Sequence, residues 1–134
     1  MIEILLPYPP TANTYWRRAG THIHLSARGA KYIQAVQGRV LRAGRPKALG
    51  GECVVDIFSW PPDNRVRDID NIQKPLLDSL VKAGVLADDR FVARLTTTRG
   101  PKVQDGAVLV RIWAFVPSLY PMPHIGLLIR EAHR

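Results

Sequence analysis

The chain has only one cysteine among its 134 residues, Cys53. A single thiol cannot form an intrachain disulfide, and it excludes a thiolate zinc cluster. Cys53 stands directly before Val54 and Val55, where a free cysteine behaves as a small buried apolar residue. The fold must therefore be held by an apolar core, and a chain of this length suffices for one such core. We expect a single domain.

Long apolar runs are also absent. No stretch approaches the roughly 20 apolar residues that span a bilayer, and residues 1–7 do not resemble a signal peptide. Internal repeats and low-complexity segments are lacking as well. We expect a protein without membrane association that acts in the cytoplasm.

Acidic residues are scarce. Eleven Asp and Glu stand against nineteen Lys and Arg, which gives a formal charge of +8 and a pI near 10.3. This charge favours association with a polyanion, and nucleic acid is the first candidate. Motifs have to supply the rest of the identification.

Four segments have the composition of β-strands. They are rich in Val, Ile and aromatic residues and are bounded by Pro or Gly: residues 2–6, 53–60, 92–98 and 107–115. The last two are joined by a segment that contains Gly100-Pro101 and Asp105-Gly106. We expect these two strands to form a hairpin with a long loop.

Two segments have the apolar spacing of helices. The first covers residues 26–43 with Ser26 as its N-cap, and the second covers about 71–83; a glycine follows each. Pro75 removes a backbone hydrogen bond, so we expect the second helix to start late or to kink. Strands that frame helices predict an α+β fold, a small mixed sheet with two main helices on one face.

The remaining segments predict less regular structure. Residues 11–18 are typical of a loop, and three prolines interrupt the chain after Val116. We expect one domain over residues 1–116. Residues 117–134 would form a C-terminal extension that is flexible or docks on a subunit.

Basic, aromatic and histidine side chains offer two interpretations each. Arg28, Lys31, Arg39 and Arg42 share one stripe of the first helix, which is either a solvated face or a phosphate-tracking surface. Tyr8, Tyr15 and Trp16, near Arg17 and Arg18, either stack on unpaired bases or pack in the fold. His22 and His24 lie in a loop or short strand without a third nitrogen ligand nearby, which favours phosphate contacts or plain exposure over zinc.

The most informative segment leads from a strand into the second helix. Asp68 and Asp70 are two residues apart, so in an extended segment their carboxylates would face the same side. Asp70, Lys74 and Asp78 are spaced by four, so a helix that included them would place them on one face. Asp88-Asp89 follow after a short turn, and the spacing alone does not say whether they return to the helix N-terminus.

Grouped carboxylates repel one another unless they are protonated or bridged by a cation. Oxygen ligands suit a hard ion such as Mg²⁺, which is the usual machinery of phosphodiester hydrolysis. Lys74 would stabilise charge that grows in the transition state, or would form an ordinary salt bridge to Asp70 or Asp78. By themselves Asp68 and Asp70 are more typical of helix-capping and loop acids than of a metal site.

Four segments together resemble one known family. They are Leu6-Pro7-Tyr8-Pro9-Pro10-Thr11-Ala12-Asn13-Thr14-Tyr15-Trp16-Arg17, the segment 26–32, Arg67-Asp68-Ile69-Asp70-Asn71-Ile72-Gln73-Lys74, and Gly84-Val85-Leu86-Ala87-Asp88-Asp89. In this order and spacing the chain resembles RusA-type crossover-junction (Holliday-junction) endodeoxyribonucleases, over roughly residues 2–115. It departs from them in the basic run before the aspartates, here Arg65-Val66-Arg67, and in the tail after Phe115.

The resemblance implies a RusA-like dimeric fold and a role for each matched residue. Asp68, Asp70 and Asp89 would bind Mg²⁺, or Mn²⁺ in its place, and with Lys74 would form the catalytic set. Asp88, Asn71 and Asn13 would support the site. Members of this family, which are often encoded by phages or prophages, act as homodimers that make paired nicks in a four-way DNA junction during recombination and repair.

The basic residues near these motifs would contact the DNA phosphates: Arg17, Arg18, Arg28, Lys31, Arg65 and Arg67. Two alternatives remain open. One is a non-catalytic DNA-binding protein on the same scaffold, against which the full set of acidic positions and Lys74 argues. The other is a metal-dependent nuclease that acts on flaps, forks or RNA.

Overall fold

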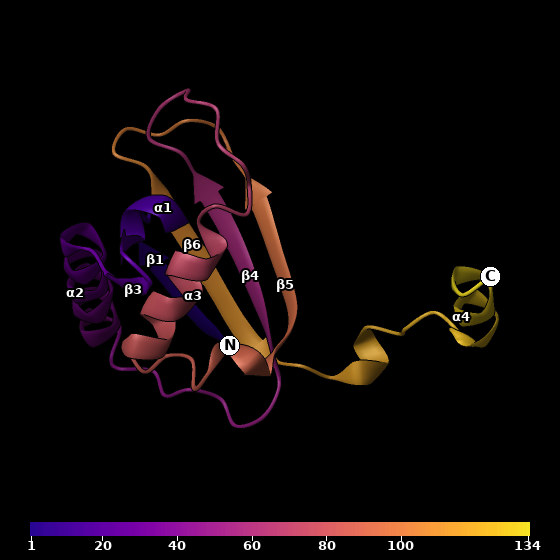
Figure 1. Ribbon diagram of the computed structural model, residues 1–134. Helices are drawn as coiled ribbons and strands as arrows, with labels where there is room; N and C mark the ends of the chain where they lie inside the picture. Colours follow the sequence, from indigo (N-terminus) through magenta and orange to yellow (C-terminus); the bar gives the residue numbers. More distant parts are fainter.

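The computed structural model describes the backbone of residues 1–134 and the side chains of all but residues 127 and 128. Its centre is a four-stranded sheet in the order β1-β6-β4-β5 (Figure 1). β1 (Ile2–Leu6) and β4 (Cys53–Trp60) both pair antiparallel with β6 (Ala107–Ala114), whereas β5 (Val92–Arg99) pairs parallel with β4. The sheet is therefore mixed, and the predicted α+β class is confirmed.

The helices α2 (Ala27–Arg42) and α3 (Gln73–Lys82) cover one face of this sheet (Figure 1). Alternate strand residues point toward them, because successive side chains of a strand face opposite sides. The resulting core includes Val55 and Ile57 of β4, Val108, Val110 and Ile112 of β6, Val36 and Val40 of α2, and Leu76 and Leu80 of α3. This core holds the strand ends and helix ends that carry the candidate site.

The predicted helix limits are confirmed within two residues. Ser26 caps α2, since its side chain accepts a hydrogen bond from the Gly29 N–H at 3.0 Å. α3 begins late, as expected, and Pro75 is its third residue, where the backbone N–H would have no partner within the helix. Gly84 follows α3 with φ of 78°, so the chain reverses there and leads back toward the start of β5.

The sequence predicted that the strands near residues 92–98 and 107–115, which are β5 and β6, form a hairpin. This prediction is wrong. β4 lies between β5 and β6 and pairs with both. Val54 is buried on the face opposite the helices, so β4 is apolar on both faces at that point and suits a central position. The connection between β5 and β6 crosses the end of β4 instead of closing a tight turn.

Residues 11–18 were expected to be a loop, and this is also wrong. They form α1 (Ala12–Tyr15) and most of β2 (Trp16–Ala19), which pairs antiparallel with β3 (His22–Leu25). Gly20 and Thr21 make the two-residue turn, with Gly20 at φ of 62°. β2 and β3 are only four residues long each, so their alternation gives little signal in the sequence.

Tyr15 fastens this N-terminal segment to both main helices. It is 0% exposed, and its hydroxyl donates to Asp78 of α3 at 2.5 Å. Its carbonyl accepts hydrogen bonds from the Ser26 N–H and the Ser26 hydroxyl, both at 2.9 Å. Of the two interpretations for the Tyr15 ring, packing in the core is the one observed.

The tail contains the short helices η2 (Pro117–Leu119) and α4 (Gly126–Ala132), and α4 lies apart from the rest of the molecule (Figure 1). Tyr120 ties the tail to the sheet: its ring stacks on Phe115 at 5.4 Å, its hydroxyl accepts from Trp113 Nε1 at 3.1 Å, and Arg94 of β5 lies over the ring at 4.8 Å. None of the helices described here is long and apolar enough to cross a membrane.

The crossing of α2 over α1 generates a stability prediction. A Cβ at Gly29 would overlap the Tyr15 carbonyl oxygen and lie 2.7 Å from Leu25 Cδ1, whereas a Cβ at Gly38 in the same helix would meet nothing within 4 Å. Gly29→Ala should therefore lower the free energy of unfolding by about 1–3 kcal/mol through overpacking. Gly38→Ala should raise it by about 0.5–1 kcal/mol. Urea denaturation checks both, and equal shifts in the two variants would contradict the close packing at Gly29.

Candidate active site

Asp68 and Asp70 lie in the turn between β4 and α3, and both are exposed. The Asn71 N–H donates to the Asp68 carbonyl at 3.2 Å, and the Gln73 N–H donates to the Asp70 carbonyl at 3.1 Å. The segment is thus a turn and not extended, and α3 begins after Asp70. The sequence placed these two carboxylates on one side only if the segment was extended, and it is not. It placed Asp70 on one helix face with Lys74 only if α3 included Asp70, and it does not.

This turn is held in place from several directions. Ile72 at its end is 3% exposed and packs in the core. The Ala12 N–H donates to the Asn71 carbonyl at 3.0 Å, which joins α1 to the turn. Gln73 Nε2 donates to Thr97 Oγ1 of β5 at 2.9 Å. Asn71 and Asn13 are consequently neighbours of the start of α3, although they are far apart in the sequence.

Lys74 and Asp89 form a hydrogen-bonded ion pair between α3 and η1 (Asp89–Phe91). The structure thus answers the question that spacing left open, because the chain after Gly84 does return to the start of α3. Asp88 caps η1, its carboxylate accepting from the Arg90 N–H at 3.0 Å.

Asp78 was expected to extend a stripe with Lys74, but it has other partners. Its carboxylate accepts from the Tyr15 hydroxyl, and it pairs with Lys82 Nζ at 3.0 Å. The alternative prediction, an ordinary salt bridge from Lys74 to Asp70 or Asp78, is therefore wrong as well. The lysine bridges two segments of the chain instead of stabilising one helix.

The ion pair changes the acidity of both partners. The hydrogen bond from Lys74 lowers the pKa of Asp89 below its ordinary value, and the same bond raises the pKa of Lys74. Both groups are therefore charged at neutral pH. An anionic carboxylate at Asp89 is the form that can bind a cation or accept a proton.

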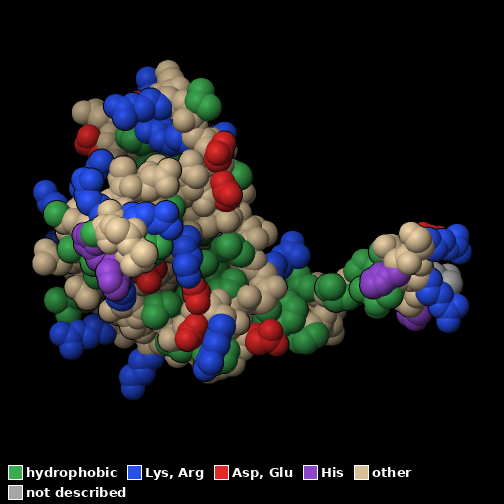
Figure 2. All heavy atoms as spheres, viewed as in Figure 1, with side chains coloured by type: hydrophobic (Ala, Val, Ile, Leu, Met, Phe, Trp, Pro, Cys, Tyr) green, Lys and Arg blue, Asp and Glu red, His purple; other side chains and the backbone are tan. Residues whose placement is uncertain are grey.

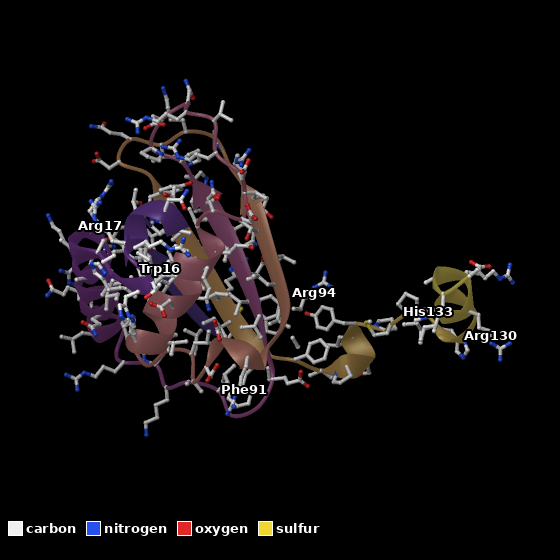
Figure 3. The ribbon with its side chains drawn as sticks, in the orientation of Figure 1. Trp16, Arg17, Phe91, Arg94, Arg130 and His133 are labelled. Atoms are coloured by element: carbon white, nitrogen blue, oxygen red, sulfur yellow. The ribbon has the colours of Figure 1, made fainter. Side chains whose placement is uncertain are left out.

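Lys74 borders a hollow of about 530 Å³, here called the Lys74 hollow. Its lining comes from α1, β2, β3 and the start of α3: Ala12, Asn13, Trp16, Arg17, Arg18, Ile23 and Lys74. Trp16 is half-buried against Tyr15, while Arg17, the next residue of β2, is exposed (Figure 3). The hollow thus combines three cations with an indole face.

A second hollow of about 760 Å³, here called the Tyr8 hollow, lies where the loops after β1 and β4 meet the start of α2. Four of the basic residues singled out in the sequence line it: Arg28, Lys31, Arg65 and Arg67. The Arg67 guanidinium lies 5.7 Å from the centre of the Tyr8 ring. Figure 2 shows Lys and Arg side chains gathered over this end of the body and over the α2 side.

Oxygen donors suited to a hard cation are present at the site, but they are not gathered. Among the side chains that the structure describes, no three His, Cys, Asp or Glu groups lie close enough together to hold a metal ion. Asp89 is paired with Lys74, and Asp68 and Asp70 face solvent from the neighbouring turn. The donor chemistry fits Mg²⁺, and binding would require these exposed carboxylates to converge.

Sequence motifs did not predict the role of three residues that shape these hollows. Ile23 lines the Lys74 hollow although it is 65% exposed, and only the β2–β3 pairing places it there. Arg99 Nη2 donates to the Arg67 carbonyl at 2.6 Å from the end of β5. Val66 lines the Tyr8 hollow. The alternation of β2 and β3 was the one signal available, and it marks only the first of these.

The geometry first defines a class: a small α+β protein whose acidic site lies among basic hollows, an arrangement suited to a phosphodiester substrate. The family model of endodeoxyribonuclease RusA matches residues 7–113. The chain belongs to this family.

Individual relatives agree. The chain is 38% identical over 110 residues to a crossover junction endodeoxyribonuclease of Enterobacteria phage HK97, covering 82% of this chain and 92% of the relative. It is 34% identical, with the same coverage, to the crossover junction endodeoxyribonucleases RusA of Escherichia coli strain K12 and Shigella sonnei. The matched part includes both segments of the acidic site and leaves the end of the tail outside the family model.

The ion pair predicts a change in acidity that is independent of any activity. Lys74→Met removes the group that lowers the pKa of Asp89, so this pKa should rise toward its ordinary value of about 3.9. Carboxyl ¹³C NMR titration measures it. Lys82→Met is the matched control, because Lys82 pairs with Asp78 and should leave Asp89 unchanged. An unaltered Asp89 pKa in Lys74→Met would contradict the ion pair.

Proposed function

We propose that this protein is a Mg²⁺-dependent endodeoxyribonuclease that resolves four-way DNA junctions by paired phosphodiester hydrolysis in recombination and repair. The proposal is carried by the contact between Lys74 and Asp89, which joins the two acidic segments beside a basic hollow. Membership of the RusA family and the names of its relatives support the same reaction. Nucleases of this family are metal-dependent, and Mg²⁺ or Mn²⁺ suits the oxygen donors.

Asp68, Asp70 and Asp89 are the proposed metal ligands. A bound Mg²⁺ supplies charge neutralisation at the phosphate and a more acidic water. Asp89 is held as an anion by Lys74, which keeps it ready to bind a cation. Lys74 itself would then be released from Asp89 to stabilise negative charge on the phosphate or on the departing oxygen.

Three neighbours support these groups. Asn71 accepts the Ala12 N–H through its carbonyl and so fixes the turn that carries Asp70. Asn13 follows Ala12 and lines the Lys74 hollow, where its amide would orient the phosphate or the attacking water. Asp88 keeps η1 in place by capping it, which positions Asp89.

The basic residues of the two hollows are the proposed phosphate contacts. Arg17 and Arg18 would contact the strand nearest to Lys74. Arg28, Lys31, Arg65 and Arg67 would contact a second stretch of backbone at the Tyr8 hollow. Contacts on both sides of the acidic turn would hold a strand across it, since phosphate contacts set the register of a protein on DNA.

A homodimer is part of the proposal. A four-way junction has two equivalent strands, and a two-fold pair of subunits presents one active site to each. We further assign catalysis to residues 1–116 and treat residues 117–134 as an extension, because the family model ends at residue 113.

The test compares cleavage and binding on the same samples. Wild type, Asp70→Asn and the matched control Glu3→Gln are incubated with a labelled four-way junction, a flap and a linear duplex, with Mg²⁺ or with EDTA. Glu3 lies on the opposite sheet face and pairs with Arg111 at 2.6 Å, so its loss removes a carboxylate remote from the site. We expect Asp70→Asn to lower the rate of paired nicking by at least about 100-fold, by analogy with lost transition-state contacts, while junction affinity is kept.

Other outcomes would redirect the proposal. Wild type that binds the junction without cutting it in any divalent metal would support the non-catalytic DNA-binding alternative. Preferential cutting of the flap would support the alternative of a nuclease that acts on flaps or forks instead of four-way junctions. Equal losses in Asp70→Asn and Glu3→Gln would remove the role assigned to Asp70.

A further inference from the structure

Val66 is the most exposed of the large apolar side chains that the structure describes, at 99%. Single exposed apolar residues are common and need no explanation by themselves. Val66 differs because its neighbours in the loop, Arg65 and Arg67, are both cations and line the same hollow. A loop that holds this valine outward by its own contacts would distinguish it from an ordinary exposed residue.

The loop beneath Val66 is braced by its own side chains. The Asp63 carboxylate accepts from the Arg65 N–H at 3.0 Å and pairs with the Arg67 guanidinium at 2.7 Å. The same guanidinium donates to the carbonyls of Asp63 at 3.2 Å and Arg65 at 3.4 Å. These bonds close the chain on either side of Val66, so the valine stands at the tip of a tied loop.

Contacts with other elements fix the orientation of this loop. The Arg67 side chain is only 16% exposed, and it lies over the Tyr8 ring. Arg99 at the end of β5 donates to the Arg67 carbonyl at 2.6 Å. A tip held in this way loses little conformational freedom when it inserts into a partner, which favours binding.

The surroundings of the tip indicate what it would insert into. Arg28, Lys31, Arg65 and Arg67 surround the Tyr8 hollow, and Val66 belongs to the same lining. An apolar group among several cations fits a partner that combines stacked apolar faces with a line of negative charge. DNA has both, and proteins that bend or open it insert apolar side chains between base steps.

We propose that Val66 is an apolar wedge that enters the base stack at the branch point of the DNA while the exposed cations Arg65, Arg28 and Lys31 hold the phosphates. This inference rests on the proposed function and adds a determinant of substrate choice to it. Inserting a side chain between stacked base pairs costs a few kcal/mol per step in linear duplex. At a branch the stack is already interrupted, so the insertion costs less there. Asp68 follows two residues later, so the wedge also sets the scissile phosphate relative to the acidic turn.

The test uses a four-way junction with 2-aminopurine at its centre, bound by full-length protein in EDTA so that no strand is cut. Wild type should raise the 2-aminopurine fluorescence as the base unstacks. Val66→Ser should lose most of this rise. It should also cut the junction about tenfold more slowly in Mg²⁺, because two methyl groups are no longer there to be buried between the bases. Its junction affinity should stay within about threefold of wild type, since the phosphate contacts remain.

Two further variants complete the experiment. Val116→Ser makes the same change at a valine that is 43% exposed at the start of the tail, and it should behave as wild type. Val66→Leu keeps an apolar tip and should preserve both the fluorescence rise and the cutting rate. Because Val66 has almost no buried surface, both Val66 variants should unfold at the same urea concentration as wild type.

The wedge and the proposed function fail in different ways. If wild type cuts no junction, the proposed function fails whatever the fluorescence. If wild type cuts the junction and Val66→Ser matches it in rate and in 2-aminopurine signal, the function stands and the wedge is overturned. Equal losses in Val66→Ser and Val116→Ser would overturn it too.

Discussion

Burial of Tyr15 is the constraint on which the arrangement of the site depends. The ring fills the core between α1 and α3, and its hydroxyl donates a hydrogen bond to the Asp78 carboxylate. The Tyr15 carbonyl accepts a hydrogen bond from the hydroxyl of Ser26, whose side chain also caps α2. One residue therefore fixes the N-terminal segment against both main helices. The position of Asn13 and Trp16 beside Lys74 follows from this packing, together with the hydrogen bond from the Ala12 N–H to the Asn71 carbonyl and the pairing of β2 with β3.

The second organising element is the parallel crossover from β4 through α3 to β5. This crossover brings the chain back to the start of the neighbouring strand, and its two connections carry the acidic residues. Lys74 in the first turn of α3 and Asp89 just before β5 form an ion pair across this crossover, and the charge of each stabilises the other. The apolar core thus sets the positions of α3 and η1, and the ion pair then favours the charged forms of Lys74 and Asp89.

Much of this fold was predictable from local sequence. β1 and β4 end where Pro7 and Pro61 stop them, and α2 and α3 follow from apolar spacing, the Ser26 cap and the glycines behind them. The order of the strands was not predictable, because strand pairing is set by packing between distant segments. The same holds for the site: its residues could be named from their motifs, but the partner of Lys74 lies across the crossover. Asp78 has the better spacing along the helix, yet Tyr15 and Lys82 occupy it.

The tail has a consequence for the outer edge of the sheet. β5 is the last strand, and its free edge offers unpaired backbone groups to any other extended chain, a known route to aggregation. Arg94 projects from that strand (Figure 3). Its guanidinium lies over the Tyr120 ring, which stacks on Phe115 and is hydrogen-bonded to Trp113, so the chain turns past the beginning of the edge. Arg94 and Arg99 add charge along the same strand. One aromatic residue and two arginines thereby protect the free edge of β5 against pairing with a second extended chain.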